Sequence, residues 1–311
     1  MAETPAGFRR ACSAISRGLD VNIDLDDREN PLVTFRPIPV PMHKMSSEKT
    51  PDVISNASRI GVSVAKLAIQ AKTNEYHGIP DSPAAIRQEV LERSGVVTLR
   101  SLLHWCWSKG VPVVHLSHTP GLKMDGLAVE ISGETAIVTA KTDYPSKLAF
   151  IVAHELGHIS LDHLKNESGF IADEHVERAT NDVVEIAANQ FACELLTGDP
   201  DPQFGYVDRK WPQGLVLAED AKNAADHAET PIDPAQIVNN WCFIEVERLK
   251  ANGIEKPRHV WGIGANALKA LDEVPADGPP IIREVAEEYL DSDELTNDSW
   301  RLLSRLTGGR R

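Results

Sequence analysis

The sequence predicts an α+β protein, in which a short run of strands lies between two helical regions. Two β-rich runs, "DGLAVEIS" and "TAIVTAKT", flank the turn "SGE" and predict a hairpin over about residues 125–142. The apolar segment "KLAFIVAHELGHISLDHL" follows and predicts a largely buried helix. Apolar residues at helical spacing before and after these segments predict helices on both sides of the strands.

The composition is that of a globular protein. The 311 residues are 42% hydrophobic, enough for one large domain or two small ones. A net charge of −14 and a pI near 5.2 argue against a nucleic-acid-binding protein, which would normally have a basic face. Because the chain shows neither an apolar leader nor an 18-residue apolar run, we expect a cytoplasmic protein without a membrane span. The scattered cysteines are expected to be reduced: Cys12, Cys106, Cys193 and Cys242.

The first 50 residues are predicted to be an irregular, proline-rich arm. The stretch "PLVTFRPIPVPMHKMSSEKTP" holds five prolines, which fit extended chain better than a helix. A docked edge strand around Val33 and Phe35 is the alternative. A helical region is expected over residues 51–97, the core over 98–200, and a second helical region over 201–311.

Helix boundary signals follow in order. Residues 53–71 have helical spacing, Ser82 and Pro83 start a second helix, and Thr98 caps a third that ends at Gly110. A DNA-reading helix-turn-helix is the alternative for these helices, but none shows the basic face that such a unit needs.

Strands and further helices come next. A short strand is expected over residues 111–117, before the hairpin. The apolar helix after the hairpin is expected to have Ser146 as its N-cap, and the helix "VVEIAANQFACELLTG" to end at Gly198. The last third is mostly helical, in segments separated by proline and glycine.

The sequence "HELGH" places two histidines and a glutamate where they can form a metal site. His154 and His158 are one turn apart and about 40° apart around the helix, so both imidazoles can bind one ion. Neutral imidazole is a common ligand of Zn²⁺. Glu155 lies beside them, out of the metal's direct reach, where it can act as a general base on water.

Chance and satisfied core histidines are the alternatives for this motif. A random H-E-x-x-H has a probability of roughly 0.03 in a chain of this composition. The helix is otherwise apolar, and burying these polar groups there without partners would be costly. Gly157 costs about 1 kcal/mol relative to alanine in mid-helix, and it suits a place where another backbone approaches closely.

A catalytic zinc site needs a third protein ligand, and Glu185 is the best candidate. Its neighbours are small and apolar, and Ala188 and Ala192 would let this helix approach the first one closely. Asn189 is expected to place its side-chain oxygen near the outer nitrogen of a ligand histidine. A helix–helix hydrogen bond without a metal role is the alternative for Asn189.

Other polar residues near the motif receive no metal role. His163 is too close along the chain to be the third ligand, because five residues past His158 it points about 140° away on the same helix. No residue clearly stabilises an oxyanion; Tyr144 and His175 are chemically able, but each is more simply a structural hydrogen-bonding group.

"HELGH" followed by "EIAANQFACELLTG" resembles the ImmA/IrrE family of metallopeptidases, whose signature is HExxH followed by E-x-x-A-N-x-F-A. The resemblance covers about residues 98–198. One departure is Ala187, where members often carry a second acidic residue, although that residue is not the expected ligand. The matching positions after HExxH are Glu185, Ala188, Asn189, Phe191 and Ala192.

The resemblance implies a zincin-like core, in which a small antiparallel sheet lies beside two ligand-bearing helices. It also implies a cytoplasmic zinc endopeptidase that cleaves a helix-turn-helix (XRE-type) transcriptional repressor, in a mobile-element or stress-response module. Many members are fused to such a DNA-binding domain; none is apparent here, so the regulator is expected to be a separate chain. An extended substrate could add to a strand of the hairpin through backbone hydrogen bonds.

Two other functions stay open. The zinc could be structural or sensory in a protein that binds a partner without cleaving it. Alternatively, the chain could be the toxin of a toxin–antitoxin pair. Glu155 favours an enzyme, because a structural zinc site has no need of a general base.

Overall fold

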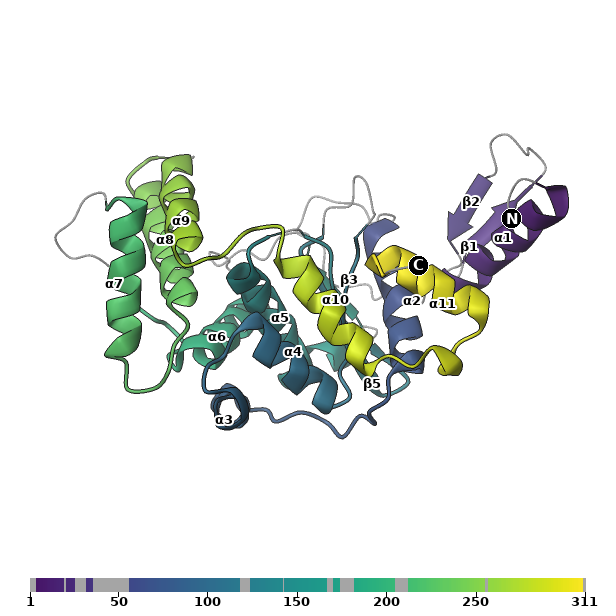
Figure 1. Ribbon diagram of the computed structural model, residues 1–311, viewed down its shortest axis with the longest axis horizontal. Helices are drawn as coiled ribbons and strands as arrows, with labels where there is room; N and C mark the ends of the chain where they lie inside the picture. Colours follow the sequence, from purple (N-terminus) through teal and green to yellow (C-terminus); the bar gives the residue numbers. More distant parts are fainter. Residues whose placement is uncertain are drawn as a thin grey trace.

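The computed structural model of the protein shows an α+β fold, with a sheet surrounded by helices (Figure 1). The structure describes residues 4–19, 21–25, 32–35, 56–117, 124–141, 143–166, 170–173, 182–204, 212–254 and 257–309. Its α-helices are α1 (Pro5–Gly18), α2 (Asn56–Ala71), α3 (Pro83–Ser94), α4 (Leu99–Ser108), α5 (Pro145–Ser160), α6 (Val183–Thr197), α7 (Gly214–Asp226), α8 (Pro234–Ala251), α9 (Arg258–Ala270), α10 (Gly278–Tyr289) and α11 (Asn297–Thr307). Its strands are β1 (Val21–Asp24), β2 (Leu32–Phe35), β3 (Val113–His115), β4 (Gly126–Ile131), β5 (Glu134–Thr139) and β6 (Phe170–Asp173). Short 3₁₀ helices are η1 (His163–Asn166) and η2 (Ser292–Glu294).

The main sheet has the strand order β3–β5–β4–β6. The predicted hairpin forms its centre: β4 and β5 are antiparallel, and Ser132 and Gly133 make the turn with φ angles of 56° and 84°. β6 is antiparallel to β4, whereas β3 is parallel to β5. The sheet is therefore mixed and not purely antiparallel as expected. The reason is that β5 returns between β3 and β4, and so runs in the same direction as β3.

Two hydrophobic cores hold the described part of the chain together. The first lies around the main sheet and α5, and it includes side chains from the distant helices α10 and α11: Ile282, Val285 and Leu303. The second joins α7, α8 and α9, which stand together at one end of the molecule (Figure 1). The residues expected to form one C-terminal helical region thus contribute to two cores. None of the described helices is long and apolar enough to cross a membrane.

Capping residues set several boundaries where the sequence predicts them. The side chain of Ser82 accepts the N–H of Ala85 at the start of α3. Thr98 and Ser101 form a reciprocal capping box at the start of α4. Gly198 ends α6 in the left-handed conformation, with φ of 87°. Helix α11 has no counterpart in the sequence predictions.

The N-terminal residues differ from the expected irregular arm. The side chain of Thr4 accepts the N–H of Gly7 and begins α1, which lies against α2 and α11. Strand β2 contains Val33 and Phe35, but it pairs with β1 and does not join the main sheet. The five prolines on which the prediction depends lie outside the described residues: Pro31, Pro37, Pro39, Pro41 and Pro51.

The start of α5 also differs from the prediction, because Ser146 is not its N-cap. Tyr144 holds that position without a side-chain hydrogen bond, and Pro145 begins the helix with its fixed φ angle. Ser146 lies in the first turn, where its N–H and Oγ–H donate to the carboxylate of Glu273 at 3.0 and 2.5 Å. The carboxylate of Glu273, far along the chain, therefore accepts hydrogen bonds at the N-terminus of α5, where the helix dipole is positive.

Candidate metal centre

Helices α5 and α6 carry the expected site residues, and they lie in close contact. Helix α5 is buried along most of its length and also contacts β4 and β5. A Cβ on Gly157 would lie 3.2 Å from the Cβ of Phe191 and 3.3 Å from the Cα of Ala188. The expectation that Gly157 admits another backbone is confirmed. This contact brings the start of α6 beside the histidines of α5.

His154, His158 and Glu185 come together where the two helices meet. The two histidine Nε2 atoms are 3.0 Å apart. Glu185 Oε2 lies 3.3 Å from His154 Nε2, and Glu185 Oε1 lies 3.7 Å from His158 Nε2. Both histidines are fully buried, and the Glu185 side chain is 20% exposed. Within the described ranges, these three residues form the one group that could hold a metal ion.

The three donor atoms fit a zinc ion in both chemistry and spacing. Two imidazole nitrogens and one carboxylate oxygen are a ligand set that zinc commonly takes in catalytic sites. Tetrahedral bonds of 2.0–2.1 Å separate neighbouring ligand atoms by about 3.3–3.5 Å. The observed separations of 3.0, 3.3 and 3.7 Å scatter around that range. The residues present therefore suit the metal that the family resemblance implies.

The outer nitrogens of both histidines have partners that orient the rings. His154 Nδ1 lies 3.1 Å from Asn189 Oδ1, which is where the sequence analysis expected that oxygen. His158 Nδ1 lies 3.0 Å from His163 Nδ1. Partners of this kind fix the tautomer of a ligand histidine and leave Nε2 for the metal.

His163 is thus part of the site, in contrast to the expectation that it points away. Helix α5 ends at Ser160, and Asp162 has a φ of 57°, so the chain turns sharply before η1. The turn brings His163 back beside His158. Asp162 is the available sequence signal, because aspartate tolerates the left-handed conformation better than most residues.

The charge of Glu185 suits a metal ligand. Burial acts to raise the pKa of this carboxyl group. Hydrogen bonds and charge from the rings of His154 and His158 outweigh that effect, so the pKa of Glu185 lies well below its usual range. A metal ligand must be deprotonated, and Glu185 meets that condition at neutral pH.

Glu155 is fully buried, and its carboxylate lies directly against the backbone of β4. A Cβ on Gly126 would overlap with Oε1 of Glu155 and would lie 2.8 Å from its Cδ and 2.9 Å from its Cγ. Only glycine fits this close approach at the start of β4. Gly126 carries no clear signal in the sequence, because "DG" before a strand has the appearance of an ordinary turn.

Of the two candidates for an oxyanion-stabilising group, the structure describes Tyr144, which lies away from the site. Tyr144 precedes His154 by ten residues, which places it about 15 Å away along the axis of α5. Its ring instead contacts the second core and lies 5.4 Å from Lys147 Nζ. His175 lies outside the described residues. Asp182 caps α6 by accepting the N–H of Val184.

Within the described residues, each strand of the hairpin already has a neighbouring strand on its outer side, contrary to the expectation that a substrate strand could add there. Strand β5 lies between β3 and β4, and β4 lies between β5 and β6. Strand β6 follows the metal-ligand helix in the chain and pairs with Gly126–Val129 of β4. Addition of a substrate to β4 would therefore require β6 to move away.

Comparison with known proteins agrees with the geometry of the site. Residues 114–203 match the family model Peptidase_M78, described as the IrrE N-terminal-like domain. No curated protein matches the chain. The matched range runs from β3 to just beyond α6 and contains the three metal-binding candidates and Glu155. Residues 114–203 are therefore an IrrE N-terminal-like domain, in agreement with the family resemblance of the sequence.

Proposed function

We propose that this chain is a zinc-dependent endopeptidase. The observation that carries the proposal is the position of Glu155, fully buried one residue from His154 and held against the backbone of Gly126. A structural zinc is normally bound by four protein ligands, whereas a catalytic zinc takes three and keeps one position open. The described residues bring three donors together. A buried carboxylate next to a three-donor cluster suits catalysis better than a structural role.

Each residue has a defined role in this proposal. His154, His158 and Glu185 would hold the zinc ion, while Asn189 and His163 orient the two rings. When bound, zinc supplies Lewis-acid chemistry, which acidifies water and polarises a peptide carbonyl. Glu155 accepts a proton from the attacking water and delivers it to the leaving amine.

The proposed substrate is a separate helix-turn-helix (XRE-type) transcriptional repressor. The family resemblance supports this choice, and so does the charge of the chain. A net charge of −14 disfavours direct binding to DNA but favours encounter with a basic DNA-binding protein. Cleavage of the repressor would relieve repression in a mobile-element or stress-response module, and such a substrate places the enzyme in the cytoplasm.

The replacement Glu155→Gln tests the peptidase proposal. Glutamine has nearly the same shape but cannot accept the proton, so we expect cleavage to fall by about 10²–10⁴-fold. Zinc content and melting temperature should stay close to those of the wild type, since the ligands are untouched. The assay is co-expression with the regulator encoded beside the gene, followed by detection of intact and cleaved regulator.

A second variant separates catalysis from metal binding. His154→Ala should lose zinc as well as cleavage. If wild type and Glu155→Gln relieve repression equally, with the regulator intact in both, the protein acts by binding its partner and the peptidase proposal is wrong.

A further inference from the structure

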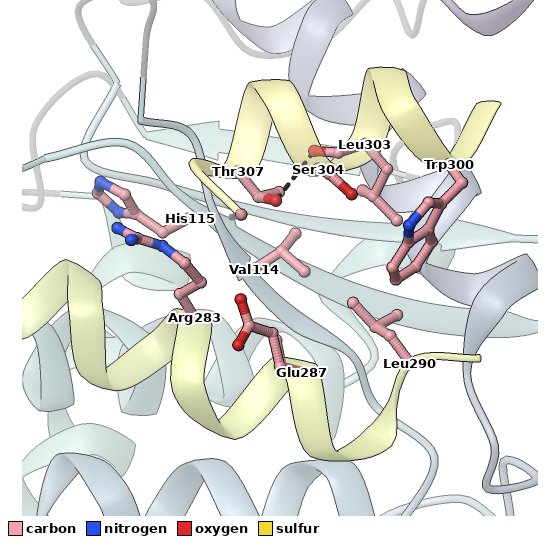
Figure 2. Close-up of a pocket in the computed structure, with 11 residues that line it drawn as sticks. Val114, His115, Arg283, Glu287, Leu290, Trp300, Leu303, Ser304 and Thr307 are labelled. Carbon is pink, nitrogen blue, oxygen red and sulfur yellow. Dashed lines mark hydrogen bonds between the residues drawn. The ribbon is translucent and has the colours of Figure 1, made fainter. Parts of the chain in front are cut away.

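A cavity of about 230 Å³ lies between β3, α10 and α11 and shares no residue with the metal centre (Figure 2). It holds the volume of roughly eight water molecules, at about 30 Å³ each. Pockets for drug-sized ligands span about 300–1,000 Å³, so this cavity suits a smaller molecule.

The cavity changes in polarity from one end to the other (Figure 2). At one end, Arg283 of α10 lies beside His115 of β3. Glu287, one helical turn after Arg283, lies in the middle. At the other end, Leu290 and Trp300 provide an apolar wall. A ligand that fills the cavity therefore meets a cation, then an anion, then apolar surface.

Among the described residues, Arg283 has no hydrogen-bond partner at Nε and no ion-pair partner. In the part of the chain that the structure describes, its Nε is buried without a hydrogen-bond partner, and its guanidinium forms no ion pair within 4 Å. A buried donor without an acceptor is destabilising, and more so when the group is charged. Glu287 is close enough along α10 for an ion pair, yet the two side chains do not form one. An anionic group of a ligand would satisfy Arg283.

His115 and Thr307, which also line this cavity, carry no charge that would compete for an anionic ligand. His115 Nδ1 lies 3.0 Å from Thr139 Oγ1, and burial together with the charge of Arg283 lowers the pKa of His115 to about 4. His115 is therefore neutral at physiological pH. The hydroxyl of Thr307, also on the cavity wall, donates to Leu303 O at 2.9 Å and keeps its oxygen as an acceptor.

We propose that this cavity binds a free apolar α-amino acid. Its carboxylate would pair with Arg283, its ammonium group with Glu287, and its side chain would contact Trp300 and Leu290. A simple carboxylate would meet repulsion from Glu287, and a simple amine would meet repulsion from Arg283. A zwitterion satisfies both, and the apolar end selects side chains such as those of leucine and phenylalanine.

Calorimetric titration of the full-length protein tests the proposal. L-phenylalanine or L-leucine should bind with a stoichiometry of one. Three analogues each lack one feature: 3-phenylpropionate lacks the ammonium group, 2-phenylethylamine lacks the carboxylate, and glycine lacks the apolar side chain. Each should bind at least tenfold more weakly. If neither amino acid binds, or if 3-phenylpropionate binds as tightly as phenylalanine, the proposal is overturned.

Two cavity variants test whether the amino acid binds in this cavity. Arg283→Gln and Glu287→Gln should each weaken binding at least tenfold, with circular dichroism to verify folding. Glu284→Gln is the matched control, because Glu284 lies on the same helix but pairs with Arg100 outside the cavity. His154→Ala should bind the amino acid normally. Loss of binding in His154→Ala, or unchanged binding in both cavity variants, would place the ligand elsewhere and overturn the proposal.

Discussion

At the scale of single residues, the Glu155 carboxylate lies in the space that a side chain at position 126 of β4 would occupy. The glycine is in ordinary strand conformation, so its role is to make room and not to allow an unusual backbone angle. The position of the proposed general base therefore depends on a residue that carries no chemistry of its own.

Gly126→Ala should displace the Glu155 carboxylate while leaving the metal ligands in place. A misplacement of about 1 Å can cost 10²-fold in rate, so we expect a loss of that order in cleavage, with zinc content unchanged. Gly262→Ala is the control, because a Cβ there meets no atom within 4 Å. Full cleavage by Gly126→Ala would show that Glu155 tolerates the shift.

His163→Ala should weaken zinc binding by about 10–100-fold, because the ring of His158 loses its partner on Nδ1. Competition with a chelator of known affinity would measure the change. His227→Ala serves as the comparison. His227 is exposed at the end of α7, and its ring forms a hydrogen bond with the carbonyl of Asn223, away from the metal centre. Equal affinity in both variants would contradict a role for His163 in the site.

Sequence periodicity predicted the residues that share a helix face, and it could not predict the others. His154, His158 and Glu185 follow from helical spacing and from the small residues around Glu185. His163 depends on where α5 ends, and Gly126 depends on a contact between segments almost 30 positions apart. Neither property is encoded in a local repeat of apolar residues.

At the scale of elements, β6 occupies the edge of β4 at which the sequence predicted that a substrate strand could add. It is a four-residue strand that covers the outer edge of β4 beside the metal centre. Strand β6 was not predicted, because such a short segment carries little β-pattern. The parallel pairing of β3 with β5 was missed for a related reason: pairing order depends on the path of the chain and not on the strands' own composition.

A disulfide between β4 and β6 would test whether substrate takes the place of β6. Ala128 and Ile171 lie opposite each other in register, at a separation that antiparallel strands allow for a disulfide. If β6 must leave, oxidised Ala128→Cys/Ile171→Cys should lose cleavage, and reductant should restore it. Unchanged cleavage in the oxidised form would place the substrate at the other edge of β6.

At the scale of the whole molecule, Glu273 links the start of α5 to the end of the α7–α9 unit. Burial, together with the charges of Asp233 and Asp143, raises the pKa of Glu273 to about 7 against the opposing hydrogen bonds from Ser146. The folded protein therefore holds this proton over a range where the unfolded chain has released it.

Stability should fall as the pH rises from about 4.5 to about 7, because the folded state binds the extra proton in that window. Glu273→Gln should flatten this part of the profile, by an amount on the order of 1 kcal/mol after allowance for partial exposure. Melting temperatures of both proteins across this range would measure it. An identical slope in Glu273→Gln would assign the pH dependence to other groups.

Because α10 and α11 contribute side chains to the first core, this core cannot be complete during synthesis until both helices have been made. Ser117, beside β3, bonds to Leu306 and Thr307 near the end of the chain, and Leu303 fills the same core. About 190 residues separate these partners, or roughly 10–40 s of translation at 5–20 residues per second. When the candidate metal ligands have emerged from the ribosome, part of the core around them has not yet been synthesised. The IrrE N-terminal-like domain is thus contiguous in sequence, yet Leu303 of its core is synthesised about 100 residues after the domain itself.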